Sequence, residues 1–407
     1  YKRQVLTQLV RLVAASPWFA DQILRQPVLL DELVDPRALY APLDRDSLRR
    51  QLDELLSGAE GDLEQEMERL RQFASTNRLC VAAADVTGAV PLMVVSDYLT
   101  DIAQVALEAA TRMAWRDVTA KHGCPQGIEG ADTGFAVVGY GKLGGIELGY
   151  GSDLDLVFLH GNRDANAMTD GKRPLANDVF YARLGQRLVF ILTTRTPSGI
   201  VYEVDMRLRP NGNAGMLVTS LPTFEHYQEH DAWTWEHQAL IRARFVAGDP
   251  AIAARFEAVR RHVLSRPRDE ETLRTDVREM REKMRTTLDK SSETEFDLKQ
   301  GRGGITDIEF MVQFCVLRWA HRHPELLEWT DNIRLLETLA RLDLLEGHAA
   351  DQLANMYRVF RAAYHRDALR ERPGLISSAN MVEERRMVRE MWHEMFGEPE
   401  AEDRAAD

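Results

Sequence analysis

Two short runs of the sequence place carboxylates at alternate positions. Asp153 and Asp155 alternate with leucines, and Glu203 and Asp205 alternate with apolar residues. Side chains of a β-strand alternate between its faces, so each run would carry its acids on one face, roughly 6–7 Å apart. Carboxylates that close repel one another unless a cation neutralises them, and oxygen ligands suit Mg²⁺. Asp153 and Asp155 therefore predict a magnesium site, with a second acidic strand available to complete it.

A glycine-rich stretch precedes the first acidic run. Gly139, Gly141 and Gly144 have the spacing of a dinucleotide-binding loop. That fold needs a crossover helix of about ten or more residues before its next strand, and the interval here is shorter and glycine-rich, so we reject a Rossmann domain. What remains is a loop whose backbone N–H groups, with Lys142 and Ser152, suit a triphosphate. Its position disfavours the alternative that the acids are solvated charges on an exposed strand.

Two further patterns have simpler explanations. His226 and His230, with a glutamate between them, have the spacing of an inverted zinc-protease motif, but no third ligand is evident. Thr306 and Glu309 form a capping box, which explains both residues without catalysis. The N-terminus of that helix is equally suited to face a phosphate, so both interpretations of Glu309 stay open.

The elements that must position the acids follow from apolar periodicity. Helices are expected to begin after Asp97 and at Asn177, each a suitable N-cap, and the pattern returns to helices from about residue 221. Three strands are expected: 135–138, 153–159 and 200–208. The fold is therefore predicted as α+β and predominantly helical, with a small mixed sheet as its core. The expected regions are a helical region over 1–122, the α/β core over 123–250, a helical bundle over 251–396 and an acidic tail over 397–407.

The composition limits the kinds of partner. The 407 residues are 44% hydrophobic and 28% charged, as in globular proteins of more than one domain. A net charge of −13 would repel a polyanion, so no nucleic acid partner is expected. No apolar run reaches the roughly 18–20 residues of a membrane helix. Cys80, Cys124 and Cys315 lie far apart and suit a reducing cytoplasm. The start at Tyr1, without a Met or signal peptide, is typical of a piece of a longer polypeptide.

The glycine stretch and the Asp pair together resemble the signature of a known family. Residues Gly139–Gly145 read Gly-Tyr-Gly-Lys-Leu-Gly-Gly, and Gly151–Leu156 read Gly-Ser-Asp-Leu-Asp-Leu. This combination resembles the bacterial glutamine synthetase adenylyltransferases, which belong to the DNA polymerase β-like nucleotidyltransferase superfamily. Three further blocks also resemble the family: Tyr202–Pro210, Trp233–Arg244 and Gly303–Phe310. The resemblance extends over nearly the whole chain and is weakest near both ends.

The resemblance implies a polymerase β-like nucleotidyltransferase core that uses ATP as substrate and Mg²⁺ as cofactor. It assigns Asp205 as the third acid, so that Asp153, Asp155 and Asp205 would be both catalytic residues and metal ligands. Asp205 would also help to deprotonate the acceptor, with Glu203 in support and Arg207 as the charge partner of Glu203. The phosphate contacts would come from the glycine stretch: Gly139, Gly141, Lys142, Gly144, Gly145 and Ser152.

The reaction implied by the resemblance is transfer of AMP from ATP to a tyrosine hydroxyl of glutamine synthetase, with release of pyrophosphate. Complete members of the family hold two related halves, of which the N-terminal one removes AMP by phosphorolysis and the C-terminal one attaches it. Three blocks resemble the attaching half: Ala214–Ser220, Trp235–Ala239 and Thr306–Asp307. Control by a PII signal protein and by glutamine is implied with it.

Three other functions compete with this interpretation. The nearest keeps the chemistry and reverses it, as phosphorolytic deadenylylation of glutamine synthetase. A non-catalytic regulatory binding module is expected to lack a metal carboxylate, and Asp153, Asp155 and Asp205 are all present. A polymerase acting on nucleic acid is disfavoured by the net charge and by the lack of a basic stretch studded with aromatic residues.

Overall fold

The structure, a computed structural model, describes residues 10, 12–14, 16–25, 42–127, 132–164, 166–196 and 198–397. The chain divides into two compact units. The first consists of Tyr1–Ala232, Arg242–Arg260 and Leu369–Glu371, and the second of Trp233–Ile241, Arg261–Ala368 and Arg372–Asp407.

The first unit contains a small mixed sheet of five strands in the order β3-β2-β1-β5, with β4 also paired to β2. β1 is antiparallel to β2 and to β5, whereas β3 and β4 both run parallel to β2 and pair with its two ends. An α-rich protein with a small mixed sheet agrees with the predicted α+β class. The strands are β1 (Phe135–Gly139), β2 (Leu154–His160), β3 (Val204–Asp205), β4 (Val218–Ser220) and β5 (Arg244–Gly248).

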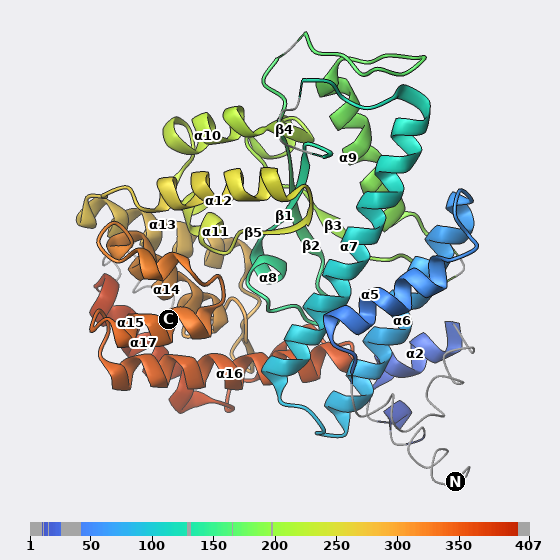
Figure 1. Ribbon diagram of the computed structural model, residues 1–407. Coiled ribbons are helices and arrows are strands. Elements are labelled where there is room, and N and C mark those ends of the chain that lie inside the picture. Colours follow the sequence, from blue (N-terminus) through green and yellow to red (C-terminus); the bar gives the residue numbers. More distant parts are fainter. Residues whose placement is uncertain are drawn as a thin grey trace. The chain divides into compact units, whose positions relative to one another are not determined.

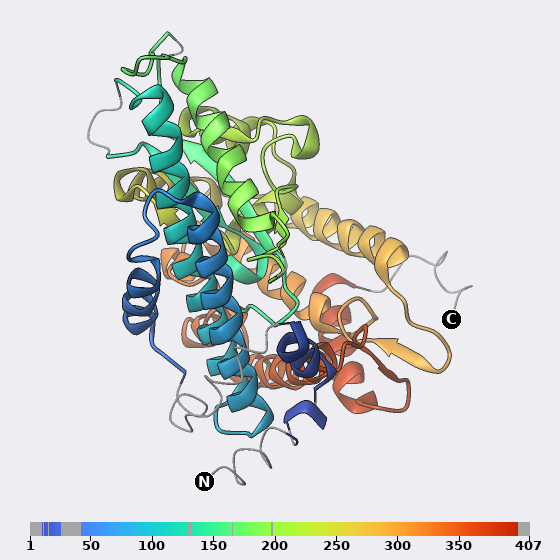
Figure 2. The ribbon, with the colours of Figure 1, turned by 90° about the vertical axis from the view of Figure 1, so that its right-hand side faces the viewer.

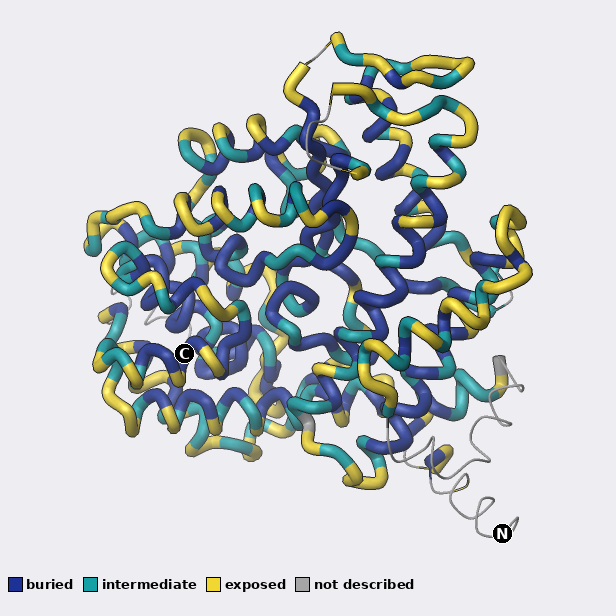
Figure 3. Tube along the Cα trace, viewed as in Figure 1, coloured by how far each residue is buried: buried dark blue, intermediate teal, exposed yellow. Residues whose placement is uncertain are grey.

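The central strands of this sheet are buried. All five residues of β1 are buried, and Figure 3 shows the same for nearly all of β2. The rings of Phe135 and Phe158 pack across the two strands with centroids 5.6 Å apart. Burial of each ring contributes roughly 1.5–3 kcal/mol, which fixes the register on which the acids of β2 depend.

Long helices pack beside the sheet. Helix α7 contacts α6, α9 and β5, and both views of the ribbon show α7 and α9 side by side (Figures 1 and 2). Gln104 of α7 donates a hydrogen bond of 3.1 Å to the carbonyl of Val246 in β5. The helices are α2 (Pro17–Arg25), α5 (Arg45–Leu56), α6 (Leu63–Val86), α7 (Leu92–His122), α8 (Gly141–Gly144), α9 (Asn177–Thr193), η1 (Gly212–Ala214) and α10 (Leu221–His230). Helix α12 (Pro250–Leu264) begins in this unit.

The expected third strand, 200–208, is wrong in extent, because only Val204 and Asp205 join the ladder. The Asp205 carboxylate accepts the backbone N–H of Arg207 at 2.8 Å, so the chain turns away immediately after the strand. Such local side-chain-to-backbone bonds compete with strand pairing. The alternation of apolar and polar residues up to Leu208 could not reveal this turn.

The helix start expected after Asp97 is wrong, whereas the start at Asn177 is confirmed and only the capping role of Asn177 is wrong. Helix α7 begins at Leu92, directly after Pro91, and Asp97 lies inside it. Helix α9 begins at Asn177 itself, after Ala176, and the Asn177 amide instead donates to the carbonyl of Gln126 at 2.7 Å. In each case a tertiary contact or a preceding proline, rather than a side-chain cap, sets the start.

The second unit is mostly helical, but it also holds an antiparallel strand pair. This pair and β5 correct the expectation of helices alone after residue 221. Helix α14 is almost entirely buried and contacts α11, α13, α15 and α17. The elements are α11 (Thr234–Ile241), α13 (Glu270–Leu288), β6 (Glu295–Asp297), α14 (Ile305–Trp319), η2 (Pro324–Leu327), α15 (Asn332–Arg341), α16 (Gly347–Leu369), β7 (Leu375–Ser377) and α17 (Val382–Phe396). None of the helices formed by the described residues combines the length and the apolarity that crossing a membrane requires.

Candidate active site

The acids of the two sequence runs meet where β2 and β3 begin. In the parallel pairing of these strands Asp155 lies opposite Asp205, and the N–H of Leu154 donates to the carbonyl of Glu203 at 3.0 Å. Residues in register on neighbouring strands project from the same face of a sheet. Asp153 is exposed and Asp155 half-buried, whereas Leu154 is fully buried, which is the alternation that the sequence predicted.

Arg207 lies beside all three aspartates. Its Nε donates to the Asp205 carboxylate at 2.7 Å, and its Nη2 bonds the same group. These hydrogen bonds hold the pKa of Asp205 below its usual value, and Asp205, Asp153 and Asp155 together raise the pKa of Arg207. The expectation that Arg207 is the charge partner of Glu203 is therefore wrong, because the turn after β3 directs the guanidinium to Asp205.

The ligand atoms at this point are of the type that a hard divalent cation binds. Asp153, Asp155 and Asp205 offer only carboxylate oxygens, the ligand type that Mg²⁺ prefers. Within the described ranges, no three or more His, Cys, Asp and Glu side chains are already arranged as a metal site. Asp205 turns its carboxylate to Arg207 instead. The chemistry of the donor set fits a magnesium ion, and a ligand role for Asp205 requires the Arg207 contact to open.

The glycine stretch brings the backbone up to Asp155. β1 ends at Gly139, and the N–H of Tyr140 donates to the carbonyl of Asp155 at 2.9 Å. Gly141 then begins the single turn of α8 with a φ of +52°. A Cβ on Gly141 would collide with the carboxylate of Asp155. Only glycine combines this backbone conformation with this close approach.

Gly144 and Gly145 have a packing role. A Cβ on Gly144 would collide with the carbonyl of Arg242, and a Cβ on Gly145 with its guanidinium. Arg242 in turn forms an ion pair with Glu147, and these two side chains are 5% and 0% exposed. The turn that carries the glycines is thus held against a buried charge pair, and a phosphate contact by either glycine stays a prediction.

The other residues of the predicted phosphate site surround the same turn. The carbonyl of Lys142 accepts the N–H of Glu147 at 2.8 Å, and the Lys142 side chain is half-buried. The hydroxyl of Ser152 accepts the N–H of Gly149 at 3.0 Å. A Cβ on Gly139 would press on the side chain of Leu143. Each residue therefore has a structural role, and each lies in the turn beside the acids.

A cavity of about 490 Å³ opens beside Asp153 in the first unit. The guanidinium of Arg78 stands 4.9 Å above the ring of Tyr202, whose buried hydroxyl has no hydrogen-bond partner among the described residues. Sequence reasoning missed this cavity because Trp18, Arg78 and Arg195 reach the motif residues from distant segments that carry no motif. The lining includes Trp18, Arg78, Tyr150, Gly151, Ser152, Arg195, Tyr202 and Glu203.

The histidine pair of the zinc-protease-like motif does not form a metal site. The rings of His226 and His230 stack with centroids 4.4 Å apart, and Nδ1 of His230 bonds the carbonyl of His226 at 2.9 Å, as neighbours on one helix do. No group of at least three potential metal ligands among the described residues includes them.

The predicted capping box at α14 is wrong. The helix begins at Ile305 after Gly304, so Thr306 lies inside the first turn, and its hydroxyl has no hydrogen-bond partner among the described residues. Glu309 instead accepts a hydrogen bond of 3.1 Å from the hydroxyl of Tyr357. Glycines before the helix obscured its start in the sequence.

Comparisons with known proteins find long and close matches. The model of the family described as glutamate-ammonia ligase adenylyltransferase matches residues 6–259, and that of GlnD PII-uridylyltransferase matches residues 271–371. Two relatives are named bifunctional glutamine synthetase adenylyltransferase/adenylyl-removing enzyme. The one from Methylococcus capsulatus is 52% identical over 97% of this chain and 42% of its own length. The one from Nitrosococcus oceani is 53% identical over 97% of this chain and 41% of its own length. The chain spans about two fifths of the length of these relatives.

Proposed function

The chain belongs to the glutamate-ammonia ligase adenylyltransferase family, and from this premise we propose that it transfers AMP from ATP to a tyrosine hydroxyl of glutamine synthetase, with release of pyrophosphate. The observation that carries the proposal is the pairing of Asp155 with Asp205 across β2 and β3, with Asp153 two residues before Asp155. Acids on one face of a sheet, beside a glycine turn, suit the transfer of a nucleotidyl group, which depends on positioning and on stabilisation of charge.

We further propose that the sheet of the first unit is a polymerase β-like nucleotidyltransferase core. The superfamily pattern is a glycine-containing turn, then Asp-x-Asp, then a third acid on a later strand. Support comes from the order β1, α8, β2 and β3, which brings the turn at Gly141 and the carboxylates of Asp155 and Asp205 to one end of the sheet.

The reaction begins at the acceptor hydroxyl. A tyrosine hydroxyl has a pKa of about 10, so at neutral pH it must give up its proton to become a good nucleophile. We assign that proton to a carboxylate oxygen of Asp205. The tyrosine oxygen bonds to the α-phosphorus, the bond from that phosphorus to the bridging oxygen breaks, and pyrophosphate leaves with the electron pair. Arg207 must first release Asp205, because its hydrogen bonds lower the pKa of this base.

Asp153, Asp155 and Asp205 are the residues that would hold Mg²⁺. When bound, Mg²⁺ supplies positive charge that neutralises the triphosphate and the leaving pyrophosphate. The chain itself would orient the phosphates along the turn after β1. The residues proposed for this are Gly139, Gly141, Lys142, Gly144, Gly145 and Ser152, all in or beside that turn.

One incubation tests the proposal. The chain, ATP labelled in the α-phosphate, Mg²⁺ and purified glutamine synthetase are mixed, and AMP is sought on the synthetase by mass spectrometry. We expect one AMP phosphodiester on a tyrosine, absent when Asp153→Asn replaces the wild-type chain. Failure to label the synthetase, or equal labelling by the variant, would exclude the proposed reaction or the proposed site.

Removal of AMP is the second candidate, because the names of both relatives include an adenylyl-removing activity and the chain matches only part of them. The blocks at Ala214–Ser220 and Trp235–Ala239 resemble the attaching half and favour transfer. Supplying AMP-modified glutamine synthetase with phosphate distinguishes the two directions. Release of ADP would identify the phosphorolytic activity.

The regulatory partners are also proposed. We propose control by a PII signal protein, supported by the match of residues 271–371 to a family named for PII uridylylation, and by glutamine, as in the resembling family. A cytoplasmic location is consistent with ATP as substrate and with three free cysteines. Neither nucleic acid nor a membrane is needed by the proposed reaction.

A further inference from the structure

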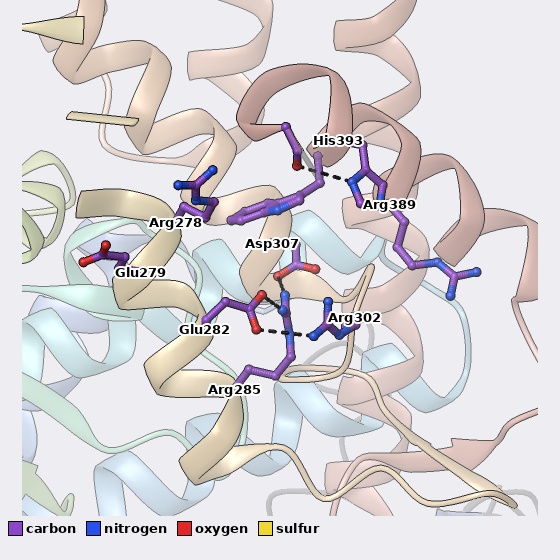
Figure 4. A pocket seen from close by; sticks show the side chains of 10 residues that line it. Arg278, Glu279, Glu282, Arg285, Arg302, Asp307, Arg389 and His393 are labelled. Atoms are coloured by element: carbon purple, nitrogen blue, oxygen red, sulfur yellow. Dashed lines mark hydrogen bonds and ion pairs between the residues drawn. The ribbon is translucent and has the colours of Figure 1, made fainter. Parts of the chain in front are cut away.

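The second unit contains a pocket that none of the candidate active-site residues lines. Its volume is about 250 Å³, and its walls are α13, α17 and the segment that leads into α14 (Figure 4). Four arginines share this small space: Arg278, Arg285, Arg302 and Arg389. Their mutual repulsion needs compensation by negative charge.

The deepest acid of the pocket is already fully used. Asp307 accepts hydrogen bonds from Nε of Arg281 at 2.6 Å, from Nη2 of Arg285 at 2.9 Å and from the N–H of Gly303 at 2.7 Å. Its side chain is 2% exposed. A buried carboxylate with three donors is a structural anchor for the arginines rather than an open site.

The other acids leave the pocket positively charged. Glu282 is shared between Arg285 and Arg302, with 3.5 Å to the latter. Glu279 is exposed and lies on the opposite side of the pocket from Arg389 in Figure 4. Asp307 and Glu282 thus pair with arginines of the protein itself. Glu279 does not face Arg389.

Donor groups remain unused at the pocket wall. The side chain of Arg285 is only 8% exposed, yet its Nε has no hydrogen-bond partner among the described residues. Burial of a donor without an acceptor is costly. Arg389 forms no hydrogen bond or ion pair within the described ranges, and its stem packs against Gly303, next to Arg302. Arg278 uses one nitrogen to hold the carbonyl of Phe396 at 3.2 Å.

We propose that this pocket of the helical unit binds a small oxyanion, a phosphate or carboxylate group, through Arg302 with Arg285 at its base, and that Arg389, whose guanidinium points away from Arg302 in Figure 4, turns inward to complete the site. The planar fork of a guanidinium matches two oxygens of such an anion, which explains why arginines rather than lysines surround the space. A volume of about 250 Å³ accommodates a small molecule and excludes a polymer. The site stands apart from the proposed AMP transfer and does not depend on it.

Calorimetric titration of the whole chain tests this site. Potassium phosphate and sodium succinate are titrated separately, with chloride at the same ionic strength as the reference. Arg389→Gln and Arg302→Gln each remove one charged donor, so we expect the Kd to rise at least about tenfold in each variant. Arg386→Gln is the matched control, since Arg386 lies on the same helix but pairs with Glu383 and Glu390.

Saturable binding that both pocket variants weaken and Arg386→Gln leaves unchanged supports the site. Binding of phosphate alone identifies a phosphate site, and binding of both anions identifies a general oxyanion site. Heat no greater than that of chloride up to roughly 10 mM, or the same Kd in all variants, overturns the proposal. Equal weakening by Arg386→Gln would also overturn it, because it would indicate unspecific charge attraction.

Discussion

Asp155 and Asp205 face each other across two parallel strands, although almost fifty residues of chain separate them. The relationship is fixed by backbone hydrogen bonding, because the N–H of Leu154 donates to the carbonyl of Glu203. The register of these two residues therefore depends on the sheet and not on the intervening loops. Catalytic groups on strands are held more accurately than groups on mobile segments.

Replacement of either Asp153 or Asp155 should abolish AMP transfer. Asp153→Asn and Asp155→Asn keep the side-chain shape and remove the negative charge, so we expect a loss of at least about a hundredfold in kcat/KM with an unchanged melting temperature. Rates are measured with labelled ATP and glutamine synthetase. Asp53→Asn, at an exposed ion pair with Arg112, is the control. Retention of more than about a tenth of the rate would contradict the assignment.

Gly141→Ala tests the close approach of the glycine turn to Asp155. The new Cβ would enter the space of the Asp155 carboxylate and would also impose a positive φ of 52° on alanine. The conformational strain costs roughly 1–2 kcal/mol, and the displaced carboxylate should lower the rate at least about tenfold. Gly347→Ala is the control, since a methyl group at that position would meet open space, with no neighbouring atom within 4 Å. Full activity of Gly141→Ala would show that Asp155 does not need this geometry.

The buried ion pair beneath the glycine turn should matter for stability. Glu147→Gln leaves Arg242 buried without its charge partner, so we expect the free energy of unfolding to fall by about 3–5 kcal/mol, measured by urea denaturation. The double variant Glu147→Leu with Arg242→Met should recover most of this loss. Arg112→Gln, which breaks the exposed pair with Asp53, should cost less than about 1 kcal/mol. Equal losses of unfolding free energy from the buried and the exposed pair would show that burial does not make the Glu147–Arg242 pair important for stability.

His160 should make stability depend on pH. Its side chain is buried, its ring stacks on Tyr181 at 4.7 Å, and its Nδ1 accepts the N–H of Asn162. Burial lowers the pKa of His160 to about 4, against the opposing effect of Asp178. In the unfolded chain the pKa of His160 is near 6.5, so as the pH falls the unfolded state binds a proton before the folded state does.

The contribution of His160 to the free energy of unfolding is complete above about pH 6.5. It is lost as the pH falls towards 4, and the loss is on the order of 3 kcal/mol. Urea unfolding at several pH values measures it. His160→Gln should flatten the dependence in this window, whereas His226→Gln, outside the buried core, should not. The same slope in wild type and His160→Gln would exclude this source of pH sensitivity.

The parts of the site that follow from local periodicity could be predicted from the sequence. The alternation of Asp153 and Asp155 with buried leucines reappears at the beginning of β2, where Asp153 directly precedes the strand, because the hydrophobic pattern of a strand determines which face is buried. The turn after Asp205 could not be predicted, since it depends on one carboxylate bonding its own backbone. The cavity beside Asp153 also escaped prediction, because Trp18, Arg78 and Arg195 meet only through tertiary packing.

β3 and β4 both pair with β2 on the side away from β1, one at each end of the strand, and the chain leaves the sheet between them over residues 206–217. A segment tethered at both ends can change length at little entropic cost, about 0.6 kcal/mol for each doubling. Residues 206–217 can therefore change in length or sequence during evolution while β3 and β4 keep their register with β2. Relatives that act on different target proteins are expected to differ here in length, around residues 211–213, between the two blocks that resemble the family and with the acids beside them left in place.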